Sequence, residues 1–196
     1  GFTILESPTG GYYFAGRTDS HSGDVHGMPG TGNIWFVRVD ENGNIIRQSN
    51  FGGHTQFSDV SQPKDMIFTA DNCLLILGLT YATDGDVVGN HGAGDIWILK
   101  IDTLGSLIWQ KCLGGALQEY PGGILQTMDG GYILIGVTLS LSGSGDVSFQ
   151  QRTFLRLPRR VNRLRGEVSK FRHPFPNVVA IRVELLRLKD RIEDAE

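Results

Sequence analysis

The sequence predicts a mainly β fold made of consecutive four-stranded antiparallel sheets. Three observations support this prediction. The chain has 196 residues and 27 glycines without a three-residue period, which is typical of a turn-rich β protein and not of collagen. Its residues repeat at a spacing of 62 positions. Within each repeat, short apolar stretches alternate with turns rich in Gly, Asp and Asn.

The repeat is defined by Gly, Asp and Trp positions. A shift of 62 residues aligns Trp35 with Trp97, and it aligns other pairs as well: Gly16 with Gly78, Asp24 with Asp86, Asp40 with Asp102, Gly43 with Gly105, and Gly52-Gly53 with Gly114-Gly115. A third copy starts four residues early, so that Gly136 matches Gly78. These coincidences indicate structural units of about 1–62, 63–120 and 121–148.

Each full unit is expected to contain four strands. The first strands are expected at Ile4–Ser7, Met66–Thr69 and Ile124–Thr127, and the second strands at Tyr12–Thr18, Leu74–Thr80 and Tyr132–Thr138. A long Gly/Asp loop follows. The third strands are expected at Ile34–Asp40 and Ile96–Asp102, and the fourth at Asn44–Phe51 and Ser106–Leu113. Short loops ending in Gly43 or Gly105 join the last two strands, as is typical of hairpins.

The third strand is apolar on both faces. Trp97 and Leu99 point to one side, and Ile96 and Ile98 point to the other. A unit of about 60 residues does not cover two apolar faces by itself, so the units are expected to stack as propeller-type blades. The sequence contains two full blades and half of a third, whereas a closed propeller usually has four to eight blades. We therefore expect an array that is not closed and a fragment of a longer protein.

The last 48 residues differ from the repeats in charge. Residues 1–148 carry 6 Lys+Arg and 15 Asp+Glu, a net charge of −9, whereas residues 149–196 carry 12 and 6, a net charge of +6. We interpret 149–196 as a basic, Arg-rich tail that is foreign to the domain through fusion or a shifted reading frame, or that is a basic arm for nucleic acid or an acidic partner. A short helix is expected there, because apolar residues follow helical spacing at Val178, Ile181, Leu185, Leu188 and Ile192.

Three stretches of the chain resemble a known family. They read TMDGGYILIG at 127–136, DGDVVGNHGAGDIW at 84–97 and WQKCLGG at 109–115. These repeats resemble the β-propeller-like repeat proteins of bacteria that export through the type IX secretion pathway, and the resemblance covers 1–148 only. It implies a secreted or cell-surface protein and a non-catalytic module that binds a protein or glycan ligand or acts as a spacer. The alternative is a fragment of a propeller hydrolase or lyase acting on polysaccharide, with its active site on other blades.

The long loop contains candidate metal ligands. Oxygen-bearing side chains that suit Ca²⁺ occur at Asp84, Asp86, Asn90 and Asp95. Asp24 and Asp146 recur at the position of Asp86. Asx and Gly turn chemistry explains the same composition, so both interpretations stay open. No other cofactor and no catalytic residue is expected, because none of the five histidines recurs between units and no nucleophile elbow is present.

The remaining features limit redox state and partners. Cys73 and Cys112 fall on strands two spacings apart, about 9.6 Å, beyond the roughly 7 Å limit for a disulfide, so two free thiols are expected. No apolar run of 18 residues predicts a membrane span. The acidic repeats are not expected to bind nucleic acid. Exposed sheet edges are expected to favour self-association.

Overall fold

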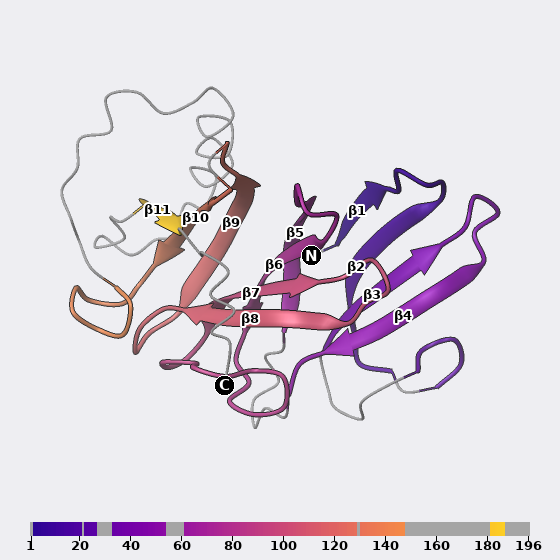
Figure 1. Cartoon of the computed structure of the whole chain (residues 1–196). Helices are drawn as coiled ribbons and strands as arrows, with labels where there is room; N and C mark the ends of the chain where they lie inside the picture. The colour runs from indigo at the N-terminus through magenta and orange to yellow at the C-terminus, as the bar shows by residue number, and fades with distance from the viewer. Residues whose placement is uncertain are drawn as a thin grey trace, which may run out of the picture.

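The computed structural model describes residues 2–20, 22–26, 33–53, 61–128 and 130–147, together with the backbone of 181–186. These residues form β-strands in antiparallel sheets, and no helix occurs among them (Figure 1). The predicted mainly β fold is confirmed. Within this part of the chain there is accordingly no helix of the length and apolar character needed to cross a membrane.

Two complete four-stranded sheets follow one another along the chain. The first contains β1 (Thr3–Glu6), β2 (Tyr12–Thr18), β3 (Asn33–Val39) and β4 (Ile45–Phe51), in that spatial order. The second contains β5 (Gln62–Phe68), β6 (Leu74–Thr80), β7 (Asp95–Ile101) and β8 (Leu107–Leu113). The third sheet contains β9 (Glu119–Gln126) and β10 (Tyr132–Thr138). All neighbouring strands are antiparallel, as expected of a meander.

The observed strands differ from the predicted ones mainly at the start of each unit. The second strands have the predicted bounds, and the third strands begin one residue earlier than predicted. However, β5 begins four residues and β9 five residues earlier than predicted. Both contain a proline, Pro63 or Pro121, next to a register shift in the ladder. Proline lacks the N–H that a regular ladder needs, and a bulge accommodates it. The sequence before and around each proline therefore lacks the pattern of a regular strand, and the start of β5 and of β9 was not predicted.

The hairpin turns explain two of the repeated residues. Gly43 and Gly105 have φ of +84° and +85°, which favours glycine. Asp40 Oδ1 accepts hydrogen bonds from the backbone N–H of Asn42 and Asn44, at 2.9 and 2.8 Å. Asp102 Oδ1 makes the equivalent bonds in the second unit, at 2.8 Å each. The repeated Asp and Gly therefore fix the turn that joins the third and fourth strands.

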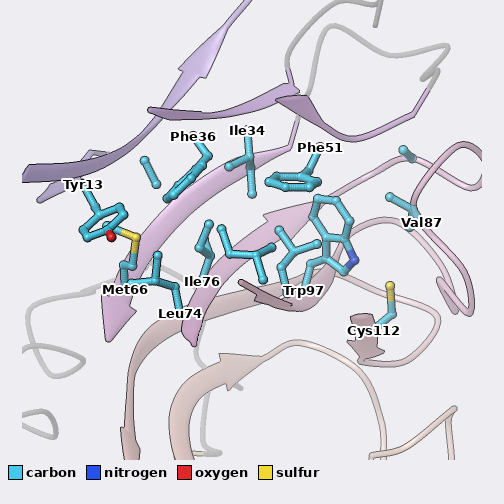
Figure 2. Close-up of a cluster of buried hydrophobic side chains, with 14 residues drawn as sticks. Tyr13, Ile34, Phe36, Phe51, Met66, Leu74, Ile76, Val87, Trp97 and Cys112 are labelled. Carbon is cyan, nitrogen blue, oxygen red and sulfur yellow. The ribbon is translucent and has the colours of Figure 1, made fainter. Parts of the chain in front are cut away.

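Apolar cores lie between successive sheets. Between the first two sheets, aromatic and aliphatic side chains of both are buried together, as Figure 2 shows for Tyr13, Ile34, Phe36, Phe51, Met66, Leu74, Ile76 and Trp97. Leu99 belongs to this core, whereas Ile96 and Ile98 belong to a second core with Ile124 and Leu134 of the third sheet. The central sheet is thus covered on both faces, as the sequence of its third strand predicts.

The first strands of the units lie side by side. β5 contacts both β1 and β9, while β4 and β8 are edge strands of their own sheets. Figure 1 shows the sheets following one another without closing into a ring over the described residues. The arrangement is a row of stacked sheets in which each unit contacts its sequence neighbours.

One strand of the tail, β11 (Ile181–Leu186), extends the third sheet. It pairs with β10 so that Ile181 lies opposite Val137 and Leu186 opposite Tyr132. β7 pairs with β6 in the same antiparallel sense and on the edge opposite the first strand, so β11 takes the place of a third strand. For these six residues the predicted helix is wrong, because Ile181, Val183 and Leu185 also alternate at the strand period and β10 offers a free edge. The other predicted features of the tail lie outside the described residues.

Both cysteines are free, as predicted. Cys73 is partly exposed just before β6, and Cys112 is buried in β8. Burial raises the pKa of the Cys112 thiol to about 12. Cys112 is therefore an inert part of the core.

Candidate functional site

The recurring polar residues gather where the end of one sheet meets the long loop of the next. The tripeptide Gly-Asp-Val occurs three times in the chain, once in each long loop. We call the four-residue segments that contain it the clasps: Ser22–Val25, Asp84–Val87 and Ser144–Val147. A Gly-Gly pair follows the fourth strand of each full unit. We use the word joint for the contact between that pair and the clasp of the next unit.

The first joint connects the first and second sheets. The backbone N–H of Asp86 donates to the Gly52 carbonyl at 2.9 Å, and the Gly52 N–H donates to Asp86 Oδ2 at 3.1 Å. The Val87 N–H donates to the Asp84 carbonyl at 3.1 Å and closes the clasp into a turn. Val87 is buried in the same core as Phe51, next to Gly52 in the chain. One loop thus supplies both a polar and an apolar contact to the preceding unit.

The second joint repeats this geometry between the second and third sheets. The Asp146 N–H donates to the Gly114 carbonyl at 2.9 Å, and the Val147 N–H donates to the Ser144 carbonyl at 3.0 Å. Val147 is buried. The Ser144 hydroxyl also accepts a hydrogen bond from the Ala116 N–H at 2.8 Å. The recurrence of Asp86 and Asp146 is therefore explained by the same backbone contact in both joints.

Close backbone approach explains the glycines of a joint. Gly85 and Gly145 have φ of +65° and +55°. A Cβ at Gly85 would lie 2.5 Å from the Gly52 carbonyl oxygen, and a Cβ at Gly145 would overlap the Gly114 carbonyl oxygen. A Cβ at Gly53 would overlap the Asp84 carbonyl oxygen, and one at Gly52 would overlap Oδ1 of Asn33 in its own sheet. Side chains at Gly53, Gly85 or Gly145 would therefore force the neighbouring sheets apart.

The four predicted metal ligands do not form one site. Asp84 and Asp86 belong to the first joint. Asn90 Nδ2 donates to the Ala82 carbonyl at 3.0 Å and its Oδ1 accepts from the Gly92 N–H at 2.9 Å, so it shapes the loop. Asp95 lies at the second joint. Among the residues that the structure describes, no three His, Cys, Asp or Glu side chains are grouped closely enough to hold a metal ion. Calcium binding stays a prediction.

Two buried carboxyl groups meet at the second joint. A Cβ at Gly114 would overlap Glu119 Oε2 and would lie 2.5 Å from Asp95 Oδ1, so the two acids face each other across this glycine. Asp95 is 0% and Glu119 is 2% exposed. Burial raises the pKa of both carboxyls. Beside them lies a cavity of about 30 Å³, enough for a single water molecule.

Hydrogen bonds hold most of these carboxylate oxygens. Glu119 accepts from the Thr138 hydroxyl at 2.6 Å and from the Gly115 N–H at 3.2 Å. Asp95 Oδ2 accepts from the backbone N–H of His91 at 3.1 Å and lies 2.7 Å from its Nδ1. Asp95 Oδ1 has no hydrogen-bond partner within the described part of the chain. The pair can hold a proton between two sheets, but its burial leaves it out of reach of a large substrate.

Sequence reasoning missed Glu119 and the role of the Gly-Gly pairs. The signal for the joints is present in the sequence, since Gly-Gly after the fourth strand and Gly-Asp-Val in the next loop recur together. No such signal exists for Glu119, because its counterpart in the second unit, Ser61, is not acidic. Ser61 lies two residues before Pro63 and bonds to the Thr80 hydroxyl, as Glu119 lies two residues before Pro121 and bonds to that of Thr138. The chain matches no protein-family model, and no curated protein sequence matches it.

Proposed function

We propose that the chain is a non-catalytic repeat module of an exported or cell-surface bacterial protein, in which stacked sheets act as a spacer and present loops to a protein or glycan ligand. The observation that carries this proposal is the repeated joint. The polar loop residues that a metal or catalytic site would need are used to fasten one sheet to the next. The resemblance of the repeats to type IX-exported proteins supports an extracellular location.

The loops at the joint end of the sheets are the surface that we assign to ligand binding. Leu117 and Leu141 are 50% and 76% exposed. The Leu117 N–H donates to Ser140 Oγ at 2.9 Å, and the Leu139 N–H donates to the Gln118 carbonyl at 3.0 Å, so the two loops are fastened side by side. Apolar side chains held out by ordered loops favour a binding surface.

Protease treatment of intact producing cells tests the location. An antibody against the chain should detect a protein that added protease removes without cell lysis. A protease-resistant pool confined to the cytoplasm would contradict export.

Ligand binding is tested on glycan and surface-protein arrays with the double variant Leu117→Ser/Leu141→Ser. Leu104→Ser is a matched control, because Leu104 is 53% exposed in the hairpin at the opposite end of β8. We expect the double variant alone to lose binding of any ligand found. If the double variant binds a ligand as well as the wild type does, the binding surface lies elsewhere on the chain. If the wild type binds no ligand on the arrays, the spacer role alone remains.

The alternative function is part of an enzyme that cleaves polysaccharide. The observation in its favour is the carboxyl pair Asp95 and Glu119, since raised pKa values are typical of acids that donate protons in catalysis. Against it, both side chains are buried, so a sugar chain has no access to them. Release of reducing ends from polysaccharide, abolished by Glu119→Gln, would favour the enzyme and overturn our proposal.

Two statements about partners complete the proposal. The repeats carry a net charge of −9 over residues 1–148, so we propose that they do not bind nucleic acid. β4 and β8 are edge strands of their sheets, and we propose weak self-association through such edges. Sedimentation over a range of protein concentrations tests the second statement.

A further inference from the structure

The first unit presents one half of a joint that nothing in the described chain fills. In each joint, the preceding unit is the donor, which supplies the Gly-Gly pair and an apolar face. The following unit is the acceptor, which supplies the clasp and a second-strand glycine and, in the first joint, a face that carries Trp97. The second and third units are acceptors for the units before them. The first unit carries the same acceptor features.

An isoleucine of the donor packs on a glycine of the acceptor in both joints. Ile34 Cδ1 lies 3.1 Å from the position that a Cβ of Gly78 would take, and Ile96 Cδ1 lies 2.8 Å from that of Gly136. The missing side chain in the second strand thus makes room for an isoleucine at the start of the third strand of the neighbouring sheet. The corresponding glycine of the first unit is Gly16. A Cβ at Gly16 would lie 2.9 Å from the ring of Phe2, and Phe2 itself is 82% exposed.

The first clasp is formed, and no described residue of the chain occupies it. Gly23 has φ of +70°, close to that of Gly85, so the loop is already bent as in an occupied clasp. A Cβ at Gly23 would meet no described atom within 4 Å, whereas those at Gly85 and Gly145 would strike the Gly-Gly carbonyl of the preceding unit. Asp24 is exposed, in contrast to the half-buried Asp86 and Asp146.

The acceptor face of the first unit is a groove. It has a volume of about 390 Å³ and is lined mainly by apolar residues of β2, β3 and β4, including Phe14, Trp35, Val37, Val39 and Ile45. The second-unit counterparts of Phe14, Trp35, Val37 and Val39, namely Ile76, Trp97, Leu99 and Ile101, are fully buried against the first sheet. In the groove itself Val37 and Val39 are buried, whereas Phe14 and Ile45 remain 37% and 41% exposed.

The tryptophan of this groove is already held in the orientation that it has in an occupied joint. Trp35 Nε1 donates to Gln48 Oε1 at 3.0 Å, and Trp97 Nε1 donates to Gln110 Oε1 at 2.8 Å. Docking would therefore order little that is not already ordered, which favours binding.

We propose that this acceptor half, made of Gly16, the clasp Ser22–Val25 and the Trp35 groove, is a docking site for another four-stranded sheet of the same repeat class. The occupant is a donor unit with an isoleucine at the start of its third strand and a Gly-Gly pair after its fourth. It is not a second copy of this chain, because the Gly-Gly pairs after β4 and β8 are both engaged in joints. This inference goes beyond the proposed spacer or ligand-binding role, because it assigns a partner to a different surface.

A fusion supplies the donor directly. A copy of residues 1–61, with Trp35→Phe in the added copy, is joined to the N-terminus of the full chain, so that the added Gly52 can reach the original Asp24. We expect the original Trp35 to lose most of its quenching by acrylamide and the Asp24 amide to exchange at least about 100-fold more slowly. A second fusion, with residues 62–118 as the donor, provides an independent test in case the first fusion does not fold.

The matched control is Gly16→Val in the original unit, which fills the space for the donor isoleucine. It should leave the unmodified chain as stable as before, because only the exposed Phe2 must move. In the fusion it should restore quenching of Trp35 and fast exchange of Asp24. The proposal is overturned if Trp35 stays accessible in both fusions. It is also overturned if the unmodified chain dimerises with Trp35 buried, which would place a second copy in the groove.

Discussion

Adding one methyl group at Gly52 should weaken the first joint through a single neighbouring side chain. The Cβ of Gly52→Ala would overlap Asn33 Oδ1 and would lie 2.8 Å from its Cγ, where ordinary contacts measure 3.4–4 Å. Asn33 is 3% exposed and cannot move freely into solvent. Gly52 does not have a positive φ, so the substitution adds no backbone strain of its own.

The expected cost follows from two opposing effects. Forcing an extra carbon into a packed site costs about 1–3 kcal/mol. Replacing glycine also makes the unfolded chain less flexible, which offsets about 0.4–1 kcal/mol. We therefore expect Gly52→Ala to lower the free energy of unfolding by about 1–2 kcal/mol.

A double-mutant cycle with Asn33→Ala identifies the cause. Asn33→Ala removes the Oδ1 and Cγ atoms that the new methyl would strike, and Oδ1 has no hydrogen-bond partner among the described residues. Measured by urea unfolding, the double variant should be more stable than the sum of the single effects by about 1 kcal/mol. Gly43→Ala is the control, because its Cβ meets nothing within 4 Å and its effect should add to that of Asn33→Ala. If the effects of Gly52→Ala and Asn33→Ala add to within about 0.5 kcal/mol, the close approach of residue 52 to the Asn33 side chain is refuted.

Three further predictions follow from burial and hydrogen bonding. Burial raises the pKa of Asp95 in the folded state, so the contribution of its protonated form to stability is present at acid pH and is lost as the pH rises through that raised value. Asp95→Asn carries the amide that Asn33 has at the equivalent position, and it should therefore gain stability relative to the wild type between pH 4 and 7 in urea unfolding. A constant difference would contradict this. Cys112, whose burial raises its thiol pKa to about 12, should react with iodoacetamide only after unfolding and Cys73 sooner, as followed by mass spectrometry; equal rates would show that the β8 core is open. Millimolar Ca²⁺ should leave the melting temperature unchanged, because Asp86 Oδ2 and Asp95 Oδ2 already accept protein hydrogen bonds. A bound ion at 100 times its Kd would instead add about 2.7 kcal/mol.

Strand positions and faces were predictable from the sequence where local pattern and environment agree. The second strands have the predicted bounds because each is a mainly apolar stretch that starts directly after a tight turn and ends in threonine. The assignment of Trp97 and Ile96 to opposite cores followed from the strand period alone. The free state of the cysteines followed from the strand order and the spacing between strands.

The residues of the joints recur visibly in the sequence, but which of them touch was not predictable because the partners lie far apart in the chain. Asp86 and Gly52 are separated by 34 residues, and only the stacking of two sheets brings them together. The loop composition alone fits both a calcium site and a set of turns, and the contacts favour the second interpretation. Similarly, Ile181–Leu186 fits a helical and a strand period, and the free edge of β10 decides between them.

Amide hydrogen exchange of the three equivalent aspartates in the unmodified chain tests the stacking of units through joints most directly. The amides of Asp86 and Asp146 donate to the carbonyls of Gly52 and Gly114 at 2.9 Å each, whereas Asp24 is exposed in an empty clasp. We expect slow exchange at Asp86 and Asp146 and fast exchange at Asp24. Fast exchange at all three positions, or equal protection of Asp24, would contradict the stacking of units through joints.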